Sequence, residues 1–260
     1  MTAPGRTLRS RAGFLLSRWP ALYARALRLR RTRDADKLAF LRLVRRGDVV
    51  FDVGANNGYY TVLFSHLAGP RGEVHAFEPV PPTFERLEAN LGREARYGNV
   101  RANRTAVGDA VGTARLFLPG EDHGQASLAR HREGSWSAGG PVSEHEAPLT
   151  TLDAYAAERG VERVDFLKCD VEGAELAVLR GGAGLLERHR PVLHLEVFPA
   201  WTRDFGYGPG EVAGFLAGLG YSRFVLLRDG GETPVRPEEL DRLEGSANLL
   251  CFPPGDRPWR

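Results

Sequence analysis

Residues 49–60, VVFDVGANNGYY, contain the pattern that decides the fold. The run Val49–Val53 is short and apolar, which is typical of a buried parallel strand. The apolar spacing after Tyr59 is that of a helix. Gly54 and Gly58, between the two, permit a sharp turn and let a ligand approach bare backbone. A strand, a glycine loop and a helix in this order predict a nucleotide or nucleoside site at the loop.

The spacing of the loop argues against a dinucleotide site. Counted from Gly54, the second and third glycines of the dinucleotide pattern are replaced by Asn56 and Tyr59, so a pyrophosphate would fit poorly. Glu78 lies twenty residues after Gly58, at the end of the next predicted strand. A carboxylate there can accept hydrogen bonds from both hydroxyls of a ribose. We therefore predict a nucleoside site in which Glu78 binds the sugar.

A third segment, Ala106-Val107-Gly108-Asp109, ends the third predicted strand and therefore lies beside the same crevice. Asp109 can accept a hydrogen bond from an adenine amino group while Val107 packs on the ring. Gly-Asp pairs also favour turns, so Asp109 can equally be a turn residue. The sequence leaves both interpretations of Asp109 open.

Strand and helix signals alternate along the chain. Strands are expected at 49–53, 74–77, 100–107, 164–170, 192–198, 221–227 and 247–252, with 113–118 alternating like an edge strand. Helices are expected from the N-cap Asp34 to Gly47 and at 60–67, 81–91, 152–159, 174–186 with a break at Gly181-Gly182, 209–219 and 238–243. Repeated strand–helix–strand units imply right-handed crossovers. We predict an α/β Rossmann-like fold with a seven-stranded, mostly parallel sheet and helices on both faces.

The chain divides by composition into a basic extension, residues 1–46, and a larger domain, residues 47–260. The extension carries thirteen Arg or Lys and two Asp, whereas the rest carries 22 basic and 31 acidic side chains, so the net charge of +2 hides a strong asymmetry. The extension also has an apolar stripe at helical spacing. We expect it to form a helical lid over the pocket or a homodimer contact. Contact with a membrane surface, a transit peptide and a solvated charged face are the alternatives.

Residues 119–148 are rich in Gly, Ser, Glu and His and show little periodicity. A connection of this length is uncommon inside a compact domain, so we expect a mobile or partly disordered flap. Trp136 with His123, His131 and His145 can grip a substrate there. Because these residues lack periodicity and ligand spacing, simple surface positions are the favoured interpretation.

Composition argues against several classes of protein. No run approaches the roughly 18 apolar residues needed to span a bilayer, so we expect no transmembrane segment. Cys169 and Cys251 lie in apolar strands without metal-ligand spacing, and we expect both to be buried and reduced, as in a cytoplasmic protein. A nucleic-acid enzyme more often spreads positive charge around its cleft. Since the chain outside the extension is acidic, we expect no nucleic-acid partner.

Several motifs, in order along residues 38–252, resemble those of the FkbM methyltransferases. They are FDVGANNGYYT at 51–61, FEP at 77–79, NV at 99–100 leading to AVGD at 106–109, TLD at 151–153, LKCDVEGAE at 167–175 and NLLC at 248–251. The resemblance implies a class I methyltransferase fold, S-adenosylmethionine as methyl donor and, commonly, O-methylation of natural products or sugars. The acidic-x-Gly-x-x-x-Gly loop of such enzymes matches Asp52, Gly54 and Gly58. The predicted cofactor-binding residues are Asp52, Gly54, Asn56, Asn57, Gly58, Glu78, Pro79, Val107, Asp109 and Asp170.

Five polar side chains occur in or just after two otherwise apolar strands: Lys168, Asp170, Glu172, His194 and Glu196. Alternation puts Lys168 and Asp170 on one side of their strand, and likewise His194 and Glu196. Core packing does not explain them, because burying an unpaired charge is costly.

Methylation of a hydroxyl needs a base within hydrogen-bond reach. Asp170 and His194 are the leading base candidates. Glu172 and Glu196 are alternatives or orienting groups, and Lys168 pairs with a carboxylate or holds the acceptor. Two plainer interpretations stay open: Glu172 accepts backbone donors at the start of the next helix, and His194 is a satisfied core histidine.

Asp170, Glu172 and Glu196, with His194, also offer ligands suited to magnesium or manganese, but a metal-free base is favoured. Nitrogen-directed enzymes of this architecture usually have Asp or Asn, Pro-Pro and an aromatic residue where this chain has Asp170-Val171-Glu172-Gly173. We therefore predict an O-methyltransferase acting on the hydroxyl of a small molecule, such as a sugar or a polyketide-type natural product. A nicotinamide-dependent oxidoreductase and a non-catalytic interaction module are the alternatives.

Overall fold

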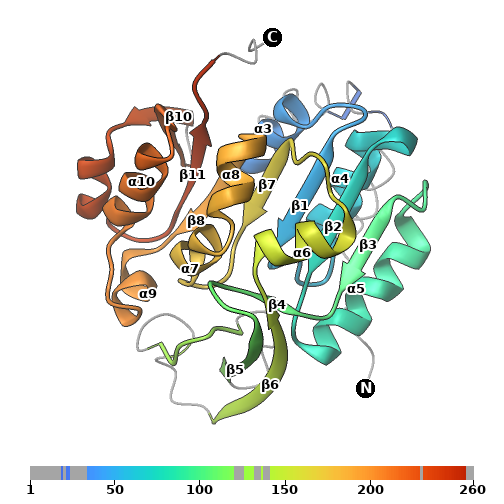
Figure 1. Ribbon diagram of the computed structural model, residues 1–260, viewed down its shortest axis with the longest axis horizontal. Helices are drawn as coiled ribbons and strands as arrows, with labels where there is room; N and C mark the ends of the chain where they lie inside the picture. The colour runs from blue at the N-terminus through green and yellow to red at the C-terminus, as the bar shows by residue number, and fades with distance from the viewer. Residues whose placement is uncertain are drawn as a thin grey trace.

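An eight-stranded sheet forms the centre of the described part of the chain (Figure 1). The computed structural model describes residues 34–119, 126–131, 141–228 and 231–255, together with Trp19, Leu22, Tyr23 and Trp136. Along the sheet, the strands are ordered β10-β9-β11-β8-β7-β1-β2-β3. Their bounds are β1 Val49–Val53, β2 Glu73–Phe77, β3 Val100–Asn103, β7 Phe166–Cys169, β8 Val192–Val197, β9 Arg223–Arg228, β10 Gly231–Val235 and β11 Ala247–Phe252.

Strand direction changes across the sheet. The neighbouring strands from β3 to β8 run parallel, and β11, β9 and β10 add to them in antiparallel fashion. This confirms the predicted Rossmann-like α/β fold with its mostly parallel sheet. The described sheet has one strand more than the seven predicted, because β10 extends it as a hairpin with β9. β10 is mostly exposed and contains Pro234, which suits an edge strand.

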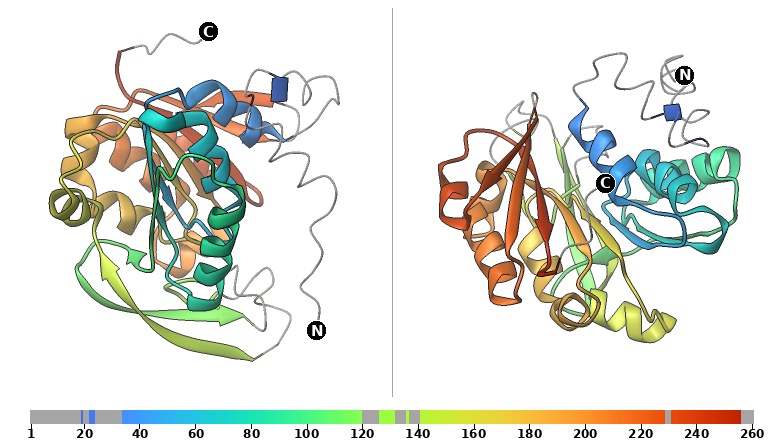
Figure 2. Two further views of the ribbon diagram at one scale, coloured as in Figure 1. Left: turned by 90° about the vertical axis from the view of Figure 1, so that its right-hand side faces the viewer. Right: turned by 90° about the horizontal axis from the view of Figure 1, so that it is seen from above.

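Helices cover both faces of the sheet (Figures 1 and 2). One face carries α3 (Ala35–Leu43), α4 (Tyr59–Ala68) and α5 (Pro81–Glu94). The other face carries α6 (Leu152–Arg159), α7 (Glu175–Arg180), α8 (Ala183–His189), α10 (Pro209–Gly218) and the 3-10 helix η4 (Pro237–Arg242). Two short helices, η1 (Gly69–Arg71) and α9 (Pro199–Asp204), were not predicted. The predicted break at Gly181-Gly182 separates α7 from α8.

A second, three-stranded sheet lies beyond the carboxyl ends of β1 and β2 within the described residues (Figures 1 and 2). Its strands are β4 (Ala106–Val107), β6 (Val142–Thr150) and β5 (Gly112–Pro119), in the order β4-β6-β5. The single strand predicted at 100–107 is therefore divided between the two sheets. The expectation of an irregular flap is wrong from Val142 onward, because β6 pairs with β5 along its length. Its mostly exposed, polar side chains give no apolar alternation. Residues 120–125, 132–135 and 137–140 of the predicted flap lie outside the described residues.

Helix α3 packs against the main core. Asp34 is its N-cap, as predicted, and accepts a hydrogen bond from a first-turn backbone N–H at 3.0 Å. The helix ends at Leu43, before the predicted end at Gly47. Phe40 is fully buried and contacts the ring of Phe166 in β7. The predicted lid or homodimer contact of the extension falls mainly on residues outside the described ranges.

Cys169 and Cys251 are buried free thiols, as predicted. Burial raises the pKa of both, which keeps them unreactive. None of the described helices combines the length and the apolar character needed to cross a bilayer.

Candidate active site

The loop between β1 and α4 crosses the carboxyl ends of the parallel strands, where open α/β sheets bind ligands. A cavity of about 80 Å³ lies beside this loop and is bounded by the ends of β2 and β7, by β4 and by the segment 126–131. Six predicted cofactor-binding residues line it: Gly54, Asn56, Glu78, Pro79, Val107 and Asp170. The structure therefore brings these distant segments to one crevice. We call it the cofactor cavity.

Two glycines shape the loop through protein packing. Gly54 has a φ of +77°, and a Cβ there would lie 1.8 Å from the carbonyl oxygen of Asp170. Gly58 has a φ of +81°, and a Cβ there would lie 2.5 Å from Leu87 Cδ1 on α5. The predicted sharp turn is present. The close approach that excludes a side chain comes from neighbouring protein atoms.

Glu78 is held at the cavity wall by backbone donors. Its Oε2 accepts from the Asn56 N–H at 3.0 Å, and its Oε1 accepts from the Val80 N–H at 2.9 Å. Burial raises the pKa of Glu78 to about 7, against the opposing effect of these two hydrogen bonds. An ionised carboxylate has about four acceptor sites, so two backbone bonds leave capacity for the ribose contact that the sequence predicts.

Four predicted cofactor-binding residues are not in the lining of the cofactor cavity: Asp52, Asn57, Gly58 and Asp109. Asp109 is exposed, and its predicted adenine contact and its role as a turn residue both stay predictions. The Asn57 side chain is also exposed and accepts from the Tyr59 N–H at 3.2 Å, so it belongs to the start of α4. Asp52 is fully buried and binds Thr61, while Gly58 packs on α5. For Asp52, Asn57 and Gly58, the geometry indicates support of the loop.

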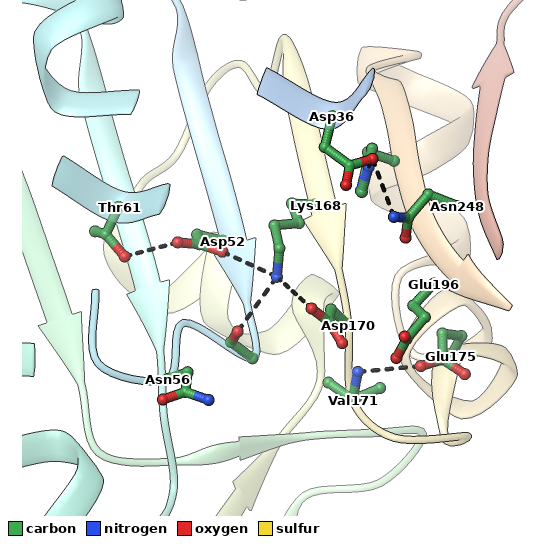
Figure 3. Close-up of polar contacts among 12 residues, drawn as sticks. Asp36, Asp52, Asn56, Thr61, Lys168, Asp170, Val171, Glu175, Glu196 and Asn248 are labelled. Carbon is green, nitrogen blue, oxygen red and sulfur yellow. Dashed lines mark hydrogen bonds and ion pairs between the residues drawn. The ribbon is translucent and has the colours of Figure 1, made fainter. Parts of the chain in front are cut away.

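Lys168 joins the β1 loop to the end of β7 (Figure 3). Its Nζ lies 3.1 Å from Asp170 Oδ2 and 3.6 Å from Asp52 Oδ1, and it donates to the Gly54 carbonyl at 3.3 Å. Burial lowers the pKa of an ammonium group, but the two carboxylates outweigh it and raise the pKa of Lys168 above its usual value. Of the two roles predicted for Lys168, pairing with a carboxylate is the one observed.

Asp170 and Glu196 form a pair of neighbouring carboxyl groups, with one oxygen of each within 4.8 Å of the other, and their pKa shifts are opposite. Burial raises the pKa of Asp170, but the Lys168 ammonium and the hydrogen bond from Glu196 bring it below its usual value. Burial and the Asp170 charge raise the pKa of Glu196 to about 9. At neutral pH, Asp170 is therefore ionised and Glu196 carries a proton. Neighbouring carboxyl groups with separated pKa values are suited to acid and base roles.

The backbone of Glu172 is clamped in a left-handed conformation, with a φ of +56°. Its carbonyl accepts from Ser127 Oγ at 2.9 Å and from His131 Nε2 at 2.7 Å. The other ring nitrogen of His131 lies 3.0 Å from Asp204 Oδ2. We call Ser127, His131 and Asp204 the Glu172 clamp. Backbone strain of this kind persists only where the surroundings enforce it.

Neither role suggested for His131 in the flap describes it. The residue is 4% exposed and its ring stacks on Trp201, with centroids 5.2 Å apart. The plainer interpretation of Glu172 is also wrong, because Glu175 takes that part. Its Oε1 accepts from the backbone N–H groups of Val171 at 3.0 Å and Gly173 at 3.3 Å. No local pattern in the sequence indicates either role.

His194 is not at the cofactor cavity, contrary to its prediction as a leading base. Its Nε2 lies 3.0 Å from Asp36 Oδ1, and its ring packs against Phe40 of α3 at 4.7 Å between centroids. It pairs across the sheet with Lys168, two residues before the strand-end position of Asp170. A strand rises about 3.3 Å per residue, so sharing a face with Glu196 still leaves His194 deeper in the sheet. The structure favours the core-histidine interpretation.

Asp170, Glu172 and Glu196 are the residues that the sequence proposes as metal ligands. One oxygen from each lies within 4.8 Å of the others, and oxygen ligands suit magnesium or manganese. Burial and the neighbouring carboxylates raise the pKa of Glu172 to about 10. An ion would therefore have to displace the protons of Glu172 and Glu196.

Comparison with known proteins identifies the family. The Methyltransferase FkbM domain matches residues 52–223. The chain is 34% identical over 201 residues to 31-O-demethyl-FK506 methyltransferase FkbM of Streptomyces tacrolimicus, covering 69% of this chain and 74% of the relative. It is 28% identical over 158 residues to 2-O-methyltransferase NoeI of Sinorhizobium fredii, covering 55% of this chain and 60% of the relative. A solved structure of methyltransferase FkbM from Methylobacillus flagellatus KT aligns with a TM-score of 0.49 at 14% identity, over 94% of this chain and 59% of that one.

Because the family domain spans most of the central sheet and the first of these relatives shares a third of its residues across most of its length, this chain belongs to the FkbM family of methyltransferases.

Proposed function

We propose that the protein transfers the methyl group of S-adenosylmethionine to a hydroxyl oxygen of a small molecule. The observation that carries the proposal is Asp170, a carboxylate that lines the cofactor cavity and lies 3.1 Å from the Lys168 ammonium group. A hydroxyl acceptor needs such a group because its proton has to leave as the new bond forms. The names of two relatives, a 31-O-demethyl-FK506 methyltransferase and a 2-O-methyltransferase, agree with oxygen as the acceptor atom.

The residues of the site divide the work of an in-line displacement. S-adenosylmethionine supplies an activated methyl group on a sulfonium. The Gly54–Gly58 loop and Glu78 bind and orient the nucleoside, since Glu78 offers acceptor sites to a ribose. As the oxygen–carbon bond forms and the carbon–sulfur bond breaks, Asp170 takes the hydroxyl proton. Lys168 and Glu196 keep Asp170 ionised and fixed in direction.

The nicotinamide alternative does not suit the loop. Asn56 and Tyr59 stand where the dinucleotide pattern needs its second and third glycines, and Gly58 packs on α5. Methyl transfer by a metal-free base is the favoured hypothesis, and Asp170, Glu172 and Glu196 are the residues that would hold a divalent ion if one takes part.

Labelled S-adenosylmethionine tests the proposal with a panel of glycosides and macrolides, with and without EDTA. We expect label in an acceptor at equal rates in both conditions. Asp170→Asn should lower kcat about a hundredfold or more, while calorimetry still detects S-adenosylmethionine binding. Glu162→Gln, the corresponding change at an exposed carboxylate outside the cavity, is the matched control and should keep full turnover. Full turnover of Asp170→Asn would refute the base assignment, and failure to bind S-adenosylmethionine would refute the function.

A further inference from the structure

A second, larger cavity opens at the same edge of the sheet, on the face covered by α3. Its volume is about 590 Å³, within the roughly 300–1,000 Å³ of small-molecule sites. It lies between the N-terminal end of α3, the first turn of α4, the end of β9 and the start of β11. Among its lining residues are Asp36, Tyr60, Arg228, Ser246 and Asn248. The cofactor cavity shares none of its described lining residues.

The two cavities meet through the carboxyl pair. Ser246, at the wall of the larger cavity, donates from Oγ to Glu196 Oε1 at 2.9 Å. Glu196 is hydrogen-bonded to Asp170, and Asp170 lines the cofactor cavity. Tyr60, on the same wall, lies in the first turn of the helix that the cofactor loop begins. The larger cavity is therefore linked to Asp170 through Ser246 and Glu196.

The wall of the larger cavity is fixed in position by its own hydrogen bonds. Asp36 Oδ1 accepts from His194 Nε2 and from Asn248 Nδ2, each at 3.0 Å (Figure 3). These contacts join α3 to β8 and β11 and set the direction of the Asp36 carboxylate. The Asp36 side chain nevertheless stays 24% exposed. Burial raises the pKa of the Tyr60 phenol, so Tyr60 keeps its proton and can both donate and accept.

The polar side chains that line the larger cavity favour a ligand with several hydroxyl groups. A carboxylate, an amide, a phenol and an alcohol can pair with several hydroxyl groups of one ligand. An apolar ligand would cover the same groups without pairing them, which is unfavourable. An anionic ligand would be repelled by the Asp36 carboxylate. Arg228 is the cation of the described lining, and it is exposed.

We propose that this cavity is the acceptor site, and that it takes a neutral, polyhydroxylated molecule such as a glycoside. Asp36 and Asn248 read its hydroxyl groups, and the hydroxyl to be methylated reaches Asp170 past Ser246. The inference rests on the proposed methyl transfer and adds the position of the acceptor site and its discrimination against acidic and apolar acceptors. Asp36 and Asn248 are specificity-determining residues here and take no part in moving the proton.

An acceptor panel tests this directly, with labelled S-adenosylmethionine and the full chain. The probes are neutral methyl glycosides of several configurations, the matching methyl glucuronides, and cyclohexanol as an apolar secondary alcohol. We expect at least one neutral glycoside to exceed both other classes tenfold or more in kcat/KM. A preference for a glucuronide or for cyclohexanol, or no transfer to any glycoside, overturns the inference.

Two substitutions locate the site. Asp36→Asn and Asn248→Leu should each raise the KM for the best glycoside about tenfold, with kcat changed less than threefold and the Kd for S-adenosylmethionine unchanged. Glu162→Gln is again the exposed-carboxylate control. If α3 loosens in Asp36→Asn, circular dichroism shows it, and Asn248→Leu on β11 then decides. A KM unchanged in a folded Asn248→Leu variant overturns the placement.

The design separates the two proposals. Loss of S-adenosylmethionine binding in the unmodified protein refutes the proposed function. Retained S-adenosylmethionine binding without transfer to any glycoside refutes only the acceptor inference.

Discussion

Lys168→Met removes the buried cation between Asp52 and Asp170, and its cost follows from the geometry. The Nζ lies 3.1 Å from one carboxylate and 3.6 Å from the other, and 2% of the Lys168 side chain is exposed. Methionine fills nearly the same space without a charge, so the loss is electrostatic. Breaking a buried ion pair by removing one partner costs about 3–5 kcal/mol. Single domains are stable by about 5–15 kcal/mol, so we expect a large part of the stability to disappear.

The direction in which pH changes this loss of stability follows from the pKa shifts of Asp170 and Lys168. The pKa of Asp170 is lowered in the folded state, so its contribution is present above about pH 3.9 and is lost as the pH falls through the lower, folded value. The pKa of Lys168 is raised, so its contribution is present below about pH 10.4 and is lost as the pH rises beyond. The pair therefore stabilises the protein across the interval between. In Lys168→Met, the stranded carboxylates can take up protons, and the deficit should shrink as the pH falls from 7.5 to 5.

Urea unfolding followed by circular dichroism at both pH values measures the deficit. Lys37→Met is the matched control, because Lys37 pairs with Asp34 at the start of α3, where both side chains are partly exposed. It should cost about 1 kcal/mol or less. Adding Asp52→Asn to Lys168→Met should restore part of the stability by removing one stranded charge. A deficit at pH 7.5 no larger than that of the control, or one that does not change with pH, would refute the reasoning.

Three further substitutions test other parts of the site. Gly54→Ala should prevent folding or lower the Tm sharply, because its Cβ would lie 1.8 Å from the Asp170 carbonyl oxygen at a φ of +77°; a Tm within a few degrees of wild type would contradict this. Glu196 keeps its proton to about pH 9 in the folded state, so its effect on stability becomes unfavourable as the pH rises from about 4.3 towards 9. Glu196→Gln should remove that decline, and an unchanged slope in denaturation at several pH values would show the raised pKa to be wrong. His131→Phe keeps a ring against Trp201 but loses the bond to the Glu172 carbonyl, so the KM for S-adenosylmethionine should rise severalfold; unchanged kinetics would mean that the clamp does not support the site.

The regular alternation of short apolar strands and helices made the fold predictable from the sequence. Each such unit carries its own signal, and parallel strands with covered faces are apolar throughout. β6 and β10 were not predicted because they are held mainly by backbone pairing and their polar side chains face solvent. Pairing of this kind leaves no period in the sequence.

The candidate site was predictable where it depends on strand ends. Glu78 and Asp170 each follow a parallel strand, and such ends converge at one edge. His194 was misplaced because alternation reports the face of a strand but not the depth along it. Asp36 was missed for another reason: its partners His194 and Asn248 are 158 and 212 residues away, and no local pattern encodes such contacts.

The segment 126–131 contacts both the cofactor cavity and the backbone of Glu172. Ala126 and Leu128 form a wall of the cofactor cavity, while Ser127 and His131 hold the carbonyl of Glu172. A donor in the cofactor cavity therefore contacts the same segment that holds the Glu172 carbonyl. Donor binding and the backbone conformation of Glu172 are then thermodynamically coupled, and each changes the free energy of the other by the same amount. We expect an ordered kinetic sequence, donor first and acceptor second, with spent donor competing only against fresh donor in product-inhibition plots.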